Sequence, residues 1–132
     1  MFELKKITKQ YGQTTVLHET TLTVNDGEFF VLVGASGSGK TTLLKLLNRL
    51  IEPTSGTILR NGNPLHDLNL RSLRLDTGYV LQQIALFPNL TVGENIALVP
   101  SMKHIDKNEI RRRSHLLLEK TGLDPLQSHG LI

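Results

Sequence analysis

A glycine-rich loop at residues 34–42, with the sequence GASGSGKTT, constrains the fold of this chain more than any other feature. It fits the phosphate-loop pattern G-x-x-x-x-G-K-[ST] through Gly34, Gly39, Lys40 and Thr41. Five consecutive apolar residues, FFVLV at 29–33, come directly before the loop, and leucines at helical spacing follow it. A strand, a glycine loop and a helix in this order favour a nucleotide-binding α/β fold over an ordinary glycine-rich turn.

Each residue type in the loop suits the binding of phosphate. Glycines at positions 34, 37 and 39 allow backbone N–H groups to face inward without a Cβ obstructing phosphate oxygens. Lys40 is expected to reach the β- and γ-phosphates of ATP, and Thr41 to offer its hydroxyl to Mg²⁺. The helix that starts there points its positive end at the anion. We therefore expect Lys40 to act in catalysis as well, and the nucleotide to contact Gly34, Ser36, Gly37, Ser38, Gly39, Lys40, Thr41 and Thr42.

The rest of the chain alternates between strand and helix patterns. Period-two patterning before residue 25 and a TILR run with Asn61-Gly62 predict antiparallel strands and a tight hairpin. Continuous apolar runs at 29–33 and 78–81 predict buried strands of a parallel sheet, and the leucine stripe predicts a helix over 40–51, ended by Pro53 and Gly56. Two further helices are indicated by capping-box spacings that involve Thr91 with Glu94 and Asp106 with Glu109.

Composition narrows the class of protein. The 132 residues are 39% hydrophobic and contain no cysteine, which fits one globular domain and excludes disulfide scaffolds and cysteine chemistry. The net charge of +3 is too small to indicate a nucleic-acid partner, and the run at 111–113 is interpreted as a solvated helix face. The sequence shows neither a bilayer-spanning run nor a secretory leader, so we expect a soluble chain.

Several motifs together resemble the ATP-binding subunit of an ABC transporter, over residues 2–125. Besides the phosphate loop, Tyr11 in KQYG and Gln82 in GYVLQQ stand where that family has its adenine-stacking aromatic and its Q-loop glutamine. The resemblance implies that Tyr11 stacks on adenine and that Gln82 contacts Mg²⁺ and the attacking water. Gln83 is the alternative register for the second role. The implied fold is an ABC-type P-loop NTPase with an N-terminal antiparallel β subdomain, part of the parallel-sheet core and the start of the helical subdomain.

The same resemblance implies partners and a location. The segment after Gln82, IALFPNLTVGENIAL, is similar to the family's permease-facing region, with Leu86, Phe87 and Pro88 as a docking surface. The complete family member would form a head-to-tail dimer, in the cytoplasm and peripheral to the inner face of the cell membrane. Within the family, runs such as NRLIEPTSGTI and TGLDP look like the branch that imports glycine betaine, carnitine or choline.

The chain departs from the family pattern after about residue 125. It contains no LSGGQ signature, no Walker B aspartate with its catalytic glutamate, and no switch histidine. Glu119 is interpreted as a surface residue, and no chemical role is expected for the histidines, which lie at positions 18, 66, 104, 115 and 129. We therefore expect residues 1–132 to be a truncated, partial ATP-binding domain. The alternatives are a nucleotide-binding fragment without turnover and, less in keeping with Tyr11 and Gln82, a small P-loop nucleotide kinase.

Overall fold

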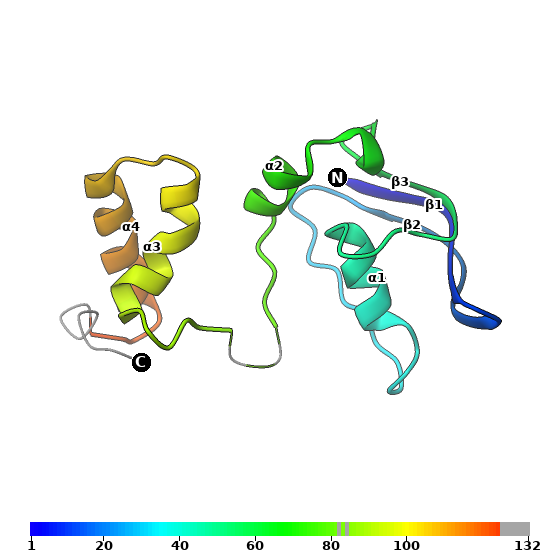
Figure 1. Ribbon diagram of the computed structural model, residues 1–132, viewed down its shortest axis with the longest axis horizontal. Coiled ribbons are helices and arrows are strands. Elements are labelled where there is room, and N and C mark those ends of the chain that lie inside the picture. Colours follow the sequence, from blue (N-terminus) through cyan, green and yellow to red (C-terminus); the bar gives the residue numbers. More distant parts are fainter. Residues whose placement is uncertain (82, 84, 125–132) are drawn as a thin grey trace. The chain divides into compact units, whose positions relative to one another are not determined.

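The computed structural model describes residues 1–81, 83 and 85–124 and consists of two compact units. The first, residues 1–77, holds a four-stranded sheet with the helices α1 and α2, and the second, from residue 78 onward, holds α3 and α4 (Figure 1). The phosphate loop lies in the first unit. The segment that follows Gln82 lies in the second.

The sheet of the first unit is antiparallel throughout, with the strand order β2-β1-β3-β4. Its strands are β1 Phe2–Tyr11, β2 Thr14–Val24, β3 Ser55–Arg60 and β4 Asn63–Pro64. The predicted antiparallel strands before residue 25 are confirmed. The predicted hairpin is confirmed as well, because Asn61 and Gly62 both have positive φ, 52° and 79°, as a type I′ turn requires.

A bulge in β1 brings two core residues to the same face of the sheet. Leu4 and Ile7 are three residues apart, so a regular strand would point them to opposite faces. The pairing with β2 shifts register between them, and Lys6 adopts a left-handed φ of 50°. Gly56 on β3 passes so close to this bulge that an added Cβ would lie 2.3 Å from the Lys6 carbonyl oxygen. Both Leu4 and Ile7 are consequently buried.

The helix after the loop packs on this sheet through its leucines. α1 spans Lys40–Leu47, and two short elements, the 3₁₀ turn η1 Leu65–Asp67 and α2 Leu70–Leu75, close the core beside it (Figure 1). The buried apolar residues of the cluster are Leu4, Ile7, Leu43, Leu46, Ile58, Leu65 and Leu73. Because two of them belong to α1, the core holds the helix that carries Lys40 and Thr41.

The prediction that this helix extends to residue 51 was wrong. α1 ends at Leu47, and Arg49 takes a left-handed φ of 48°, well before Pro53. The Arg49 guanidinium Nη1 donates to the carbonyl oxygens of Leu65 and Leu68, each at 3.1 Å. These contacts with a distant part of the chain hold Arg49 in the conformation that stops the helix.

The two apolar runs expected as buried parallel strands form no strand in the described residues, so these predictions were also wrong. The described sheet contains only β1 to β4, and neither 29–33 nor 78–81 pairs with any of them. Phe29, Val33 and Val80 are 93%, 88% and 94% exposed. A strand exists only through the hydrogen bonds of a neighbouring strand. A run of apolar residues indicates that the segment favours burial, but it does not determine whether another strand lies beside it.

The second unit is built on two helices, α3 Val92–Met102 and α4 Lys107–Lys120, which pack against each other (Figure 1). The predicted capping box at the start of α3 is confirmed, with Glu94 N donating to Thr91 Oγ1 and Thr91 N donating to the Glu94 carboxylate. Asp106 caps α4 by accepting from the N–H groups of Asn108 and Glu109.

Glu109 does not complete the second predicted capping box, because its carboxylate is used by two arginines of its own helix. Arg112 and Arg113 both donate to it, and these hydrogen bonds lower the pKa of Glu109 to about 2. All three arginines of the run at 111–113 are exposed, so its interpretation as a solvated helix face is confirmed. Within the described residues, no helix has the length and apolar content needed to cross a bilayer.

Candidate nucleotide site

The ammonium group of Lys40 lies inside the glycine loop. Its Nζ donates to the carbonyl oxygens of Gly34 and Ala35, each at 2.7 Å, and to Ser38 Oγ at 3.1 Å. These three acceptors come from both ends of the turn that Lys40 follows. These hydrogen bonds hold the positive charge of Lys40 within the loop of residues 34–39, where an anion bound by the loop would lie.

Glycine is required at two points of the loop. Gly37 and Gly39 have left-handed φ angles of 79° and 86°. At Gly39 a Cβ would also lie 2.7 Å from the carbonyl oxygen of Val16 on β2. The loop therefore lies directly against the second strand of the sheet, and this contact fixes where α1 begins.

The first turn of α1 is equipped to attract an anion. Gly39 at the N-cap has no side chain to accept from the first N–H groups, and the first turn contains no acidic residue. Thr41 is exposed beside Lys40, and Thr42 is half-buried. Backbone donors, the helix dipole and a lysine thus converge at one helix end, an arrangement that binds phosphate.

A groove of about 720 Å³ adjoins this helix end in the first unit. Lys40 and Thr41 line it together with Glu28, and its remaining walls are apolar side chains of the sheet, of residues 29–32 and of α1. The Glu28 carboxylate is engaged in the preceding turn, where Oε2 accepts from the backbone N–H of Asn25 at 2.7 Å.

Tyr11 stands at the end of β1 and is 53% exposed. It pairs with Thr14 across the β1–β2 hairpin, and Thr14 is two residues from Val16, the residue that contacts Gly39. The first unit thus brings the aromatic residue and the phosphate loop to neighbouring positions along β2. Gln82 lies outside the described residues, so its predicted contact with Mg²⁺ stays a prediction.

In the second unit, Leu86 and Phe87 are half-exposed, at 50% and 51%. Asn95 of α3 holds the backbone of this segment: its Oδ1 accepts from Phe87 N at 2.9 Å, and its Nδ2 donates to the carbonyl oxygens of Phe87, Leu90 and Thr91 at 3.0–3.2 Å. No motif recognised in the sequence assigns a role to Asn95. The only signal was an asparagine in the first turns of a helix, where its helix propensity is poor.

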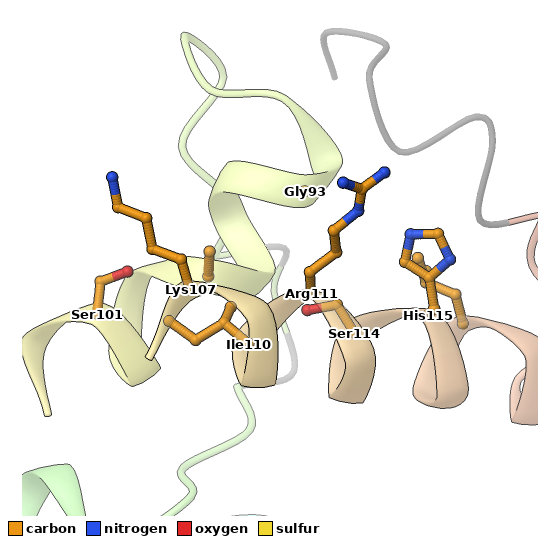
Figure 2. A pocket seen from close by; sticks show the side chains of 9 residues that line it. Gly93, Ser101, Lys107, Ile110, Arg111, Ser114 and His115 are labelled. Atoms are coloured by element: carbon orange, nitrogen blue, oxygen red, sulfur yellow. The ribbon is translucent and has the colours of Figure 1, made fainter. Parts of the chain in front are cut away.

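A second hollow, of about 450 Å³, lies between α3 and α4. Figure 2 shows Lys107, Arg111 and His115 projecting from α4 along it, opposite Gly93 and Ser101 of α3. No part of this hollow has the form of the glycine loop.

The histidines that the structure describes show no sign of a chemical role. His115 is half-buried in the hollow between α3 and α4, whereas His18, His66 and His104 are exposed and His129 lies outside the described residues. Among residues 1–81, 83 and 85–124, no three His, Asp or Glu side chains gather closely enough to hold a metal ion. Glu119 is exposed on α4, which confirms it as a surface residue.

Comparison with known proteins agrees with this geometry. The family model described as ABC transporter matches residues 17–131. The chain is 45% identical over 129 residues to the osmoprotectant import ATP-binding protein OsmV of Salmonella typhimurium, covering 94% of this chain and 34% of that relative. It is 38% identical to the choline transport ATP-binding protein OpuBA of Bacillus subtilis, covering 95% of this chain and 33% of OpuBA. The chain therefore spans about a third of the length of these relatives.

Solved structures show the same fold. The dimeric post-hydrolysis structure of the ATP-binding cassette MJ0796, bound to ADP and Pi, is similar with a TM-score of 0.83 and 32% identity. A second dimeric structure of MJ0796 gives a TM-score of 0.85. Each comparison covers 99% of this chain and 61% of the MJ0796 chain.

Proposed function

Because this chain belongs to the ABC transporter family, we propose that it forms the nucleotide-binding part of an importer's ATP-binding subunit and binds ATP with Mg²⁺. The observation that carries the proposal is the position of Lys40, whose charge is held inside a glycine loop at the start of a helix. In the complete subunit, ATP hydrolysis would be coupled to solute uptake.

Each residue of the site has a role that follows from its chemistry. Lys40 would exchange its carbonyl acceptors for the β- and γ-phosphates, and N–H groups of residues 34–42 would donate to phosphate oxygens. The exposed Thr41 hydroxyl would hold Mg²⁺ together with the phosphates, since Mg²⁺ in such sites takes few protein ligands. The bound metal would neutralise charge on the phosphates. Gln82 would help to orient the attacking water.

We expect replacement of Tyr11 by alanine to weaken ATP binding by about 1–3 kcal/mol, because stacking of a base on an aromatic ring contributes that much. Tyr11 is 53% exposed, and its partner Thr14 lies two residues along β2 from Val16, which contacts the loop. Titration calorimetry with Mg-ATP measures the change.

Two controls make this measurement specific. Tyr11→Trp should bind ATP about as well as the parent, because stacking uses only the face of the ring. Inorganic tripolyphosphate, which has no base, should bind the Tyr11→Ala variant and the parent equally. If Tyr11→Ala binds ATP as tightly as the parent does, Tyr11 has no stacking role.

We also propose that Leu86, Phe87 and Pro88 form the surface that contacts the permease. Leu86 and Phe87 are apolar and half-exposed, and the Asn95 side chain presents them on a fixed backbone. A photoreactive residue at position 87 should cross-link to the permease subunit in membranes that carry it. The same residue at the exposed position 66, in the other unit, should not. Equal cross-linking from both positions would contradict a docking role.

The solute, location and assembly are further proposals drawn from relatives. OsmV is named for osmoprotectant import and OpuBA for choline transport, which supports a quaternary-ammonium osmoprotectant as the solute. The dimeric MJ0796 structures support a dimer of the complete subunit, for which the family resemblance implies a head-to-tail arrangement. Such a subunit would work in the cytoplasm, at the inner face of the membrane beside its permease.

A further inference from the structure

Lys9 covers one face of the Tyr11 ring. Its Nζ lies 4.9 Å from the ring centroid, within the range in which a cation is attracted to the negative face of an aromatic ring. The same ammonium group donates to the carbonyl oxygen of Glu52 at 2.7 Å. Lys9 has no role in any motif recognised in the sequence.

The acceptor of Lys9 is itself fixed. The segment 52–54 is tied to β1 by two further hydrogen bonds, from Thr54 N to the Thr8 carbonyl oxygen and from Gln10 N to Thr54 Oγ1, each at 2.9 Å. The Glu52 side chain also accepts from Arg49 Nε at 3.0 Å. The Glu52 carbonyl oxygen is therefore held in place by the hydrogen bonds of its segment, and it determines the position of the Lys9 ammonium group.

We propose that Lys9 is a positioning residue for the base of the nucleotide: anchored on Glu52, it holds the Tyr11 ring so that one face stays free for adenine. The inference rests on the proposed ATP site. Holding the ring beforehand reduces the entropy that is lost when the base stacks. A cation on one face also draws electron density from the ring, which favours stacking of an electron-rich purine on the other face.

The anchor of Lys9 lies apart from the phosphate loop. Glu52 lies shortly after α1, and α1 begins at the phosphate loop with Lys40. Lys9 thus connects the aromatic ring to the segment that follows α1, beyond the helix end that lies away from the phosphate loop. A residue with this role should affect the binding of ligands that contain the base and leave the binding of phosphate chains alone.

The test compares Mg-ATP with Mg-tripolyphosphate by titration calorimetry on the full chain. Lys9→Met, which keeps the length but loses the charge, should weaken ATP binding about two- to fivefold and leave tripolyphosphate binding unchanged. Lys9→Arg should restore most of the ATP affinity, because a guanidinium also binds a ring face. Lys5→Met is the matched control: it removes the same charge from an exposed position on the same strand, beside Glu3, and should change neither affinity.

The outcomes separate this inference from the proposed function. ATP binding by Lys9→Met that equals the parent's would overturn the positioning role and leave the ATP site intact. An equal loss for ATP and tripolyphosphate would also overturn it, because Lys9 would then act on the phosphates or on the fold. A parent chain that binds neither ligand would overturn the proposed function, and this inference with it.

Discussion

Lys40→Ala is expected to reduce ATP binding by about 3 kcal/mol or more, a factor of about 100 or more in Kd, because charge-assisted hydrogen bonds to two phosphates are lost. The variant also loses the three hydrogen bonds by which Nζ joins Gly34, Ala35 and Ser38. The loop then lacks both the positive charge and the hydrogen bonds that join its two ends. Calorimetry with Mg-ATP is the direct measurement.

Lys45→Ala is the matched control for this experiment. Lys45 is exposed in the last turn of the same helix, so the substitution removes the same charge without touching the loop. Thermal unfolding of both variants shows whether the fold is retained. If Lys40→Ala and Lys45→Ala bind ATP alike, the loop is not the phosphate site.

The second prediction with a large effect is that this chain does not hydrolyse ATP. The 132-residue chain is expected to bind ATP and release no phosphate above the level of its Lys40→Ala variant. Phosphoryl transfer needs an oriented water and compensation of the developing charge. The sequence contains no Walker B aspartate with a following glutamate and no LSGGQ motif. The first turn of α1 contains no acidic residue, and Glu28 in the adjoining groove is engaged with Asn25.

A phosphate-release assay on homogeneous protein decides this, with an intact ABC ATP-binding protein as positive control. Clear Mg²⁺-dependent turnover that disappears in Lys40→Ala would refute the prediction. In that case Glu28→Gln would show whether Glu28 is the base, since it lines the same groove as Lys40 and Thr41.

The parts of the fold that could be predicted from sequence are those that depend on near neighbours in the chain. The Asn61-Gly62 turn and the Thr91/Glu94 capping box are each completed within a few residues, and both are present as expected. The end of α1 at Arg49 could not be predicted, because carbonyl groups of Leu65 and Leu68 determine it. The bulge at Lys6 likewise depends on pairing with a separate strand.

The candidate site also has parts that could be predicted from the sequence and parts that could not. The glycine loop identified Lys40 because the motif is continuous, and left-handed φ angles occur at Gly37 and Gly39, where glycine was expected to be needed. The contact between Gly39 and Val16, and the anchoring of Lys9 on Glu52, join residues more than 20 positions apart. No local pattern reports such contacts, so they could be found only in three dimensions.

The strand order β2-β1-β3 has a consequence for synthesis on the ribosome. β1 and β2 can form a hairpin as soon as residue 24 has emerged, but β3 joins the far edge of β1 only after residue 60. At about 5–20 residues per second, that interval lasts on the order of seconds. During that interval the edge of β1 that later pairs with β3 carries unpaired backbone N–H and C=O groups, the kind of strand edge at which chains associate wrongly.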